Sequence, residues 1–165
     1  MTGTVLVTYG TTNGSTAEIA EAVADVLRKD GLTVEALPAG SVTSVARYDG
    51  VVVGGALYAG RWHKDARRFV RRNRLLLAQR PVWFFSSRPL GTSVSDRDLP
   101  PVPGVRRAMN RLGVRDHVTF GGRLEEGAKG WVAGMILRSG KGGDFRDFGV
   151  IETWAKGVAD AVTHS

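Results

Sequence analysis

The sequence contains no cysteine, and this absence excludes several kinds of chemistry. Without thiols the chain forms no disulfide, uses no thiolate nucleophile, and holds no zinc ion or iron–sulfur cluster through cysteine. The three histidines, His63, His117 and His164, are not paired with other ligands along the chain, so no metal site is expected. The first residues do not have the pattern of a signal peptide, so none is expected, and the sequence has no apolar run near ~18 residues. A cytoplasmic location is the expectation that follows.

Acidic residues are scarce in the later part of the chain, which makes the charge uneven. The net charge is +7, made up of about −3 up to Gly60 and about +10 from Arg61 onward. Such asymmetry favours an acidic partner for the later part, although arginine can equally serve as a solubilising surface residue. No known DNA- or RNA-binding motif is present, so nucleic acid is not expected as a partner.

Regular patterns of apolar residues predict one α/β domain over residues 1–165. Short apolar runs predict five buried strands at Thr4–Thr8, Thr33–Leu37, Val51–Gly55, Pro81–Ser86 and Val118–Gly121. Helical spacing of apolar residues predicts helices around Ile19–Leu27, Phe69–Leu77, Val105–Leu112 and Ile151–Val162. Strands that alternate with helices imply a parallel sheet between two helical layers, and thus a three-layer αβα sandwich.

The loop after the first strand has the composition of a phosphate site. It reads Tyr9-Gly-Thr-Thr-Asn-Gly-Ser-Thr16 and leads directly into a helix. Free N–H groups and the dipole at a helix start favour an anion, and Gly10 and Gly14 permit close backbone approach. The loop has no Lys or Arg, no GKS or GKT, and no GxGxxG, which argues against a nucleotide triphosphatase and a dinucleotide fold.

This loop resembles the fingerprint of the flavodoxin family, aromatic-Gly-Ser/Thr-x-Thr-Gly-x-Thr. Thr11, Gly14 and Thr16 match it, and Asn13 replaces a hydroxyl residue while keeping a donor. The resemblance implies a flavodoxin-like fold with a five-stranded parallel sheet, and FMN as the cofactor. The residues that it implies for the phosphate are Thr11, Thr12, Asn13, Gly14, Ser15 and Thr16.

Two further loops are expected to flank the flavin ring, because ligands of such sheets sit beyond the carboxyl ends of the strands. In the first, Tyr58 and Trp62 either stack on the ring or pack against the sheet edge, and the backbone at Ala59 and Gly60 is expected near the flavin N5. In the second, Ser86 and Ser87 are expected beside the pyrimidine side, with Arg88 stabilising charge near N1. The full set of expected ring contacts is Ala56, Leu57, Tyr58, Ala59, Gly60, Trp62, Ser86, Ser87 and Gly91.

Within the family, the segment 55–70 resembles the menaquinone-dependent protoporphyrinogen dehydrogenases, which have a similar Gly-Ala-x-x-x-x-Gly-x-x-His run. The tail resembles them too, in Phe120–Leu124, Trp131–Leu137 and Ser139–Gly143. The resemblance implies a hydride transfer from a small molecule to the flavin and then electron transfer to a quinone. His63 and Arg88 are then the expected catalytic residues, although His63 can equally be a surface residue that begins a helix.

Alternatives to this reading stay open. The chain could be a flavodoxin that only transfers electrons to a redox partner protein, although such shuttles are usually acidic. It could also be a binding protein that has kept the fold and lost the flavin. The arginine-rich helix beginning near Lys64 and the apolar stretch Trp131–Leu137 suggest peripheral contact with the inner face of a membrane. A homodimer is compatible with the sequence, which does not define the oligomeric state.

Overall fold

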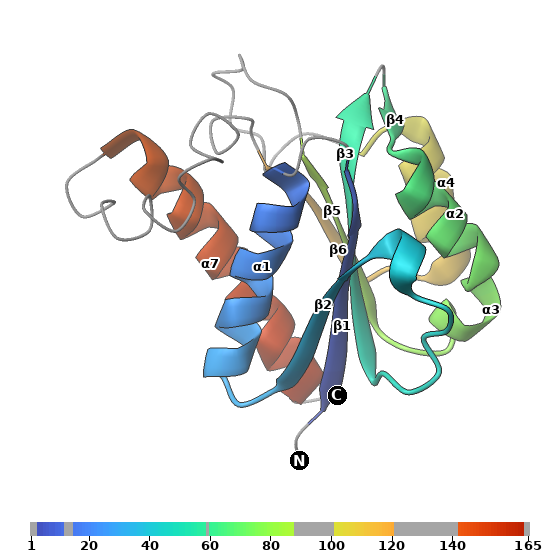
Figure 1. Ribbon diagram of the computed structural model, residues 1–165, viewed down its shortest axis with the longest axis horizontal. Helices are drawn as coiled ribbons and strands as arrows, with labels where there is room; N and C mark the ends of the chain where they lie inside the picture. The colour runs from blue at the N-terminus through green and yellow to red at the C-terminus, as the bar shows by residue number, and fades with distance from the viewer. Residues whose placement is uncertain (1–2, 12–14, 59, 88–100, 121–141, 164–165) are drawn as a thin grey trace.

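The sheet consists of five parallel strands in the order β2-β1-β3-β5-β6 (Figure 1). The computed structural model describes residues 3–11, 15–58, 60–87, 101–120 and 142–163, with the backbone alone at 15, 58 and 142–148. The strands are β1 Thr4–Gly10, β2 Thr33–Pro38, β3 Gly50–Tyr58, β5 Val82–Ser87 and β6 Asp116–Phe120. The predicted parallel α/β sandwich is thereby confirmed.

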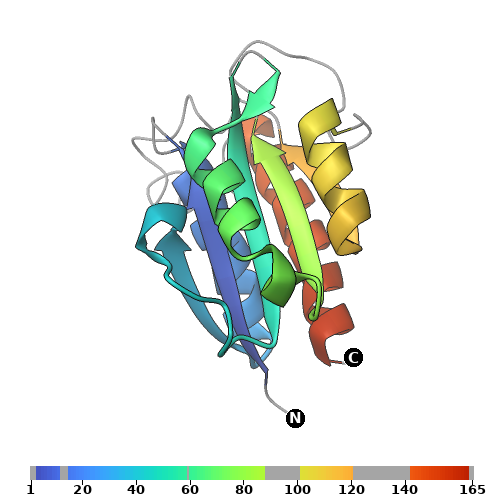
Figure 2. The same cartoon turned by 90° about the vertical axis from the view of Figure 1, so that its right-hand side faces the viewer.

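Helices cover both faces of the sheet, as Figures 1 and 2 show. On one face lie α1 Ser15–Lys29 and α7 Gly142–Thr163, which pack against each other. On the other face lie the 3-10 turn η1 Ala39–Ser41, α2 Lys64–Arg72, α3 Arg74–Leu77 and α4 Pro103–Leu112. The connection from β2 to β3, all of which the structure describes, crosses this face of the sheet and contains the short turn η1 as its one helical element.

Alternation of side chains along each strand builds two separate cores. On β5, Trp83 and Phe85 join the core under α1 and α7, while Val82 and Phe84 join the core under α2 and α4. β5 is buried at every position. Strands covered on both faces are continuously apolar, and this explains the run of four apolar residues at its start. The two cores hold the strand ends rigidly, and the candidate site is at those ends.

Two local features differ from the sequence expectation. The single helix predicted around Phe69–Leu77 is broken at Asn73, where α2 ends and α3 begins. The Asn73 amide donates to the carbonyl of Phe69 at 3.0 Å and so satisfies one of the last carbonyls of α2. A short strand, β4 Arg61–Trp62, also pairs antiparallel with the end of β3, where the sequence suggested only a loop.

Candidate functional site

The loops expected to hold a ligand start from neighbouring points of one sheet edge. Gly10 at the end of β1 is in register with Gly55 on β3, and Gly55 is in register with Ser86 on β5. The chain moves from β1 outward to β2 and then back past β1 to β3, so β1 and β3 flank the topological switch point. Ligands of open α/β sheets bind in the crevice at that point.

The first turn of α1 carries a buried hydroxyl with no partner in the part of the chain that the structure describes. Thr16 is fully buried, and its Oγ1 has no hydrogen-bond partner among the described residues. A buried polar atom left unsatisfied costs about 1–3 kcal/mol, and native structures rarely keep one without a reason. The orphaned donor stands where the N–H groups of a helix start also need an acceptor, so it fits a phosphate oxygen.

The rest of the predicted phosphate loop is only partly visible. Thr11 is half-buried at the end of β1, and Ser15 begins α1. Thr12, Asn13 and Gly14 lie outside the described residues, as does the side chain of Ser15. Their contacts with a phosphate stay predictions.

Glycine at the end of β1 lets the loop base pack closely on the start of α2. A Cβ at Gly10 would lie 2.7 Å from the backbone nitrogen of Ala66 and 3.2 Å from Nδ1 of His63. Any larger residue would push these segments apart. The close approach brings His63 beside the base of the phosphate loop.

His63 acts as the N-cap of α2. Its Nδ1 accepts a hydrogen bond from the backbone N–H of Asp65 at 3.1 Å, which satisfies a free donor of the first turn. Its side chain is 10% exposed and also lies 3.9 Å from the Asp65 carboxylate. His63 therefore begins a helix, which is one of the two roles that the sequence left open. Its role in catalysis stays a prediction.

The β3–β4 hairpin forms the second loop of the site. Leu57 pairs with Trp62 and Tyr58 with Arg61, while Gly60 takes a φ of 76° in the turn between them. The described main chain of this turn lies at the end of β3, and its contact with a flavin ring stays a prediction. Ala56 is buried and Leu57 half-buried, whereas Ala59 and the side chain of Tyr58 lie outside the described part.

Trp62 packs into the core under the hairpin. It is 3% exposed, lies over Gly55, where a Cβ would be 2.7 Å from its ring, and contacts Phe84 at 4.7 Å between centroids. Its Nε1 donates to the Ser86 hydroxyl at 2.9 Å. Of the two arrangements that the sequence allowed for Trp62, packing against the sheet is the one observed.

Ser86 links Trp62 to a half-buried histidine, His117, that sequence reasoning set aside. The Ser86 Oγ lies 2.8 Å from Nε2 of His117 on β6. Burial, helped by the nearby Arg106 and opposed by Asp116, lowers the pKa of His117 to about 4. The imidazole is then neutral, and its tautomer sets whether Nε2 accepts from the Ser86 O–H or donates to the Ser86 Oγ. Ser87, the next residue of β5, is also buried. Arg88 and Gly91 lie outside the described residues.

Glu18 is a residue of the site region that the sequence did not single out. It stands in the first turn of α1, and its Oε1 is buried without a partner in the structure as described. Burial raises the pKa of this carboxyl to about 7. An acidic residue in the first turn next to a predicted phosphate loop was the available signal, but its desolvation depends on tertiary packing.

Comparison with known proteins places this geometry in a family. A model of the flavodoxin domain matches residues 6–137. The chain belongs to the flavodoxin domain family. Flavodoxin-family proteins bind FMN, and the orphaned Thr16 hydroxyl at the start of α1 is a fitting partner for the FMN phosphate. Comparison with curated protein sequences gives no match.

Solved structures share the same fold. A flavodoxin from the domain Archaea superposes with a TM-score of 0.65 at 15% identity, covering 98% of this chain and 99% of that one. Rubredoxin oxygen:oxidoreductase from Desulfovibrio gigas gives 0.68 at 15% identity, covering 98% of this chain and 36% of that one. An azoreductase from Bacillus anthracis gives 0.60 at 13%, covering 94% and 99%. Known flavodoxin-like structures thus include both electron carriers and oxidoreductases.

The described part of this flavodoxin-family chain has neither a cluster of metal ligands nor a membrane-spanning helix. Among residues 3–11, 15–58, 60–87, 101–120 and 142–163, no three His, Asp or Glu side chains gather as metal ligands. No helix within the same residues is long and apolar enough to cross a membrane.

Proposed function

We propose that this flavodoxin-family chain is an FMN-dependent oxidoreductase that oxidises a small molecule, with a porphyrinogen-like compound as the candidate substrate and a quinone as the electron acceptor. The observation that carries the FMN part is the buried, unpartnered Thr16 hydroxyl in the first turn of α1. The substrate part rests on the resemblance of the segment 55–70 to protoporphyrinogen dehydrogenases and on the +7 charge, which suits an anionic substrate.

Three described residues of the site have a defined task in FMN binding under this proposal. Thr11 and Thr16, with the N–H groups at the start of α1, hold the phosphate. Gly60 gives the hairpin the left-handed turn that presents its main chain to the ring. When bound, FMN supplies the capacity to accept a hydride or electrons, so no nucleophile or metal is required of the protein.

His63 is the candidate for handling a proton beside the site. It stands next to Gly10, at the base of the phosphate loop, and its Nδ1 is committed to the N–H of Asp65. Arg88 keeps its proposed role of stabilising negative charge near the flavin N1.

Pure electron transfer is the second candidate function. It is favoured by the archaeal flavodoxin, which is matched over 99% of its own length. In that case the acceptor is a redox protein and the site binds no substrate. The basic charge would then require a partner whose docking surface is acidic.

Peripheral membrane contact is a subsidiary proposal. Helix α2 carries five basic residues against one acid over nine positions, and each can contribute ~1 kcal/mol near an anionic lipid surface. The apolar stretch Trp131–Leu137, expected to assist, lies outside the described residues.

The deciding experiment begins with the visible spectrum of the purified protein and chromatography of the flavin released by heat. We expect flavin bands and FMN. Anaerobic assays then compare porphyrinogen with menaquinone against a reductase and acceptor protein pair. Porphyrin formation supports the oxidoreductase, and exchange of electrons with proteins alone supports the carrier. A colourless protein that FMN cannot reconstitute would refute both.

A further inference from the structure

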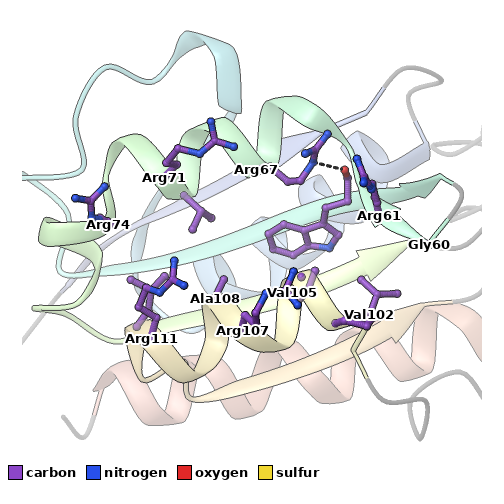
Figure 3. Close-up of a pocket in the computed structure, with 15 residues that line it drawn as sticks. Gly60, Arg61, Arg67, Arg71, Arg74, Val102, Val105, Arg107, Ala108 and Arg111 are labelled. Carbon is purple, nitrogen blue, oxygen red and sulfur yellow. Dashed lines mark hydrogen bonds between the residues drawn. The ribbon is translucent and has the colours of Figure 1, made fainter.

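A hollow lies between α2 and α4, on the outer side of the core that these helices cover. Figure 2 shows these helices standing apart along the same face of the sheet, and Figure 3 shows the side chains that line the space between them. Its volume is about 540 Å³. We call it the α2–α4 groove.

The floor of the groove is apolar. Its largest members are Trp62 and Leu112, and both are buried. The side chains of the floor come from the hairpin, from α2 and from α4: Trp62, Val70, Val102, Val105, Ala108 and Leu112. An apolar floor of this kind is stabilised when an occupant's apolar side chains displace water from it.

The walls of the groove are two rows of arginines. Arg67, Arg71 and Arg74 come from α2 and α3, and Arg107 and Arg111 come from α4 (Figure 3). All five are exposed, and the lining contains no acidic residue. None of the five forms an ion pair with any residue that the structure describes. The rows therefore repel each other unless an anionic occupant lies between them.

The spacing within each row matches a helix. Arg67 and Arg71, like Arg107 and Arg111, are four residues apart, which is close to one turn or about 6 Å along the axis. A helix lying in the groove would present acidic side chains at the same spacing on its two flanks and an apolar stripe downward. A flat membrane surface meets the arginine heads but does not reach a recessed floor.

We infer that the α2–α4 groove binds an acidic amphipathic helix of a partner protein. Charge complementarity fixes the sign of the occupant's flanks, and the apolar floor requires the stripe between them. The groove begins at Gly60 and Arg61 of the hairpin, so a docked partner would lie beside the loop expected to flank the flavin ring. The inference does not require FMN to be bound.

The test measures binding of a designed peptide by fluorescence anisotropy. The probe is a labelled 18-residue helix with leucines along one face and glutamates on both flanks, compared with a scrambled peptide of the same composition. We expect saturable binding of the designed helix and at least several-fold weaker binding of the scrambled one. Replacing one arginine in each row, Arg71→Ser with Arg107→Ser, should weaken the designed helix roughly five- to tenfold.

A matched variant distinguishes binding in the groove from nonspecific attraction to positive charge. Arg68→Ser with Arg72→Ser removes the same charge from α2, but these exposed arginines do not line the groove. We expect this double variant to weaken binding of the designed helix by less than threefold. Ala108→Glu places a carboxylate on the half-buried floor and should abolish binding even at high salt, with the circular dichroism spectrum unchanged.

Three outcomes would overturn the inference. One is equal affinity for the designed and scrambled peptides, and another is equal weakening by the two double variants. The third is no peptide binding while anionic vesicles or duplex DNA bind in a way that depends on Arg71 and Arg107. Because none of these readouts uses the flavin, they stand apart from success or failure of the redox proposal.

Discussion

Two buried oxygen atoms in the first turn of α1 lack partners among the described residues, and both belong to side chains next to the predicted phosphate loop. Thr16 Oγ1 is a hydroxyl that can donate, and Glu18 Oε1 belongs to a carboxyl whose pKa burial raises to about 7. A fold under selection for stability alone would satisfy or remove such atoms. The Thr16 hydroxyl, as a donor at a helix start, is the residue-scale argument for a bound anion there.

His117 gives a prediction on pH. Burial lowers its folded-state pKa to about 4, against 6.5 for an ordinary histidine. Below pH 6.5 the unfolded chain binds a proton that the folded chain refuses, so this residue's stabilising effect is present above pH 6.5 and declines as the pH falls toward 4. His117→Gln keeps an acceptor for Ser86 and removes the titration.

The measurement is urea unfolding of the parent and of His117→Gln at pH 7.5 and pH 4.5. Relative to the parent, the variant should gain roughly 2–3 kcal/mol on going to the lower pH, the upper bound from the shift in pKa. Glu18 acts in the opposite sense, because its raised pKa makes the fold less stable as the pH rises from about 4.5 to 7. It is common to both proteins, so it drops out of the comparison. A difference in unfolding free energy that is the same at both pH values would contradict the assignment.

Some residue placements follow from local sequence and others do not. The loop and the helix after it were predicted from the sequence, although α1 begins at Ser15 and so takes Ser15 and Thr16 from the predicted loop. The direction of the Trp62 ring could not be predicted from local sequence. It depends on the missing side chain at Gly55, on the pairing of β4 with β3 and on the Ser86 hydroxyl across the sheet. Sequence spacing carries no information on such contacts between segments.

At the scale of elements, the surroundings of two glycines predict opposite changes in stability when each is replaced by alanine. A Cβ at Gly55 would lie 2.7 Å from the Trp62 ring, whereas one at Gly157 in α7 would meet nothing within 4 Å. Gly55→Ala should therefore destabilise the protein by roughly 1–3 kcal/mol through overpacking. Gly157→Ala should stabilise it by up to about 1 kcal/mol, because alanine favours the helix.

Urea unfolding of the two alanine variants tests this pair, with the slope against urea concentration as a check for two-state behaviour. If Gly55→Ala were neutral, the close packing of Trp62 on β3 would be wrong.

The elements themselves were predictable where they are long and periodic. All five parallel strands and the starts of α1 and α4 follow from apolar runs, from the loop before Ser15 and from Pro103 at the first helical position. The strand β4 has only two residues, too few to show any period. The break at Asn73 interrupts an apolar face that continues on both sides, so the spacing alone predicts one helix.

At the scale of the whole molecule, the charge is arranged by layer. Positive charge gathers on the helices of one face, in α2, α3 and α4, while α1 on the other face carries Glu18, Glu21 and Asp25. The sequence already showed the imbalance along the chain, but the grouping of arginines from separate helices around one groove depends on the fold. An acidic partner is accordingly expected on the α2–α4 face.

The most direct test of FMN binding at the start of α1 is calorimetric titration of flavin-free protein with FMN, for the parent, Thr16→Val and Thr8→Val. Thr8 is a buried threonine on β1 whose hydroxyl donates to the carbonyl of Leu37 at 2.8 Å, so it is a matched control. Thr16→Val should weaken FMN binding about tenfold or more while leaving the flavin-free protein as stable or up to about 1 kcal/mol more stable. Thr8→Val should do the reverse, lowering stability by about 1 kcal/mol and leaving FMN affinity unchanged. Unaltered FMN affinity in Thr16→Val, or no FMN binding by the parent protein, would contradict the placement of the phosphate at this helix.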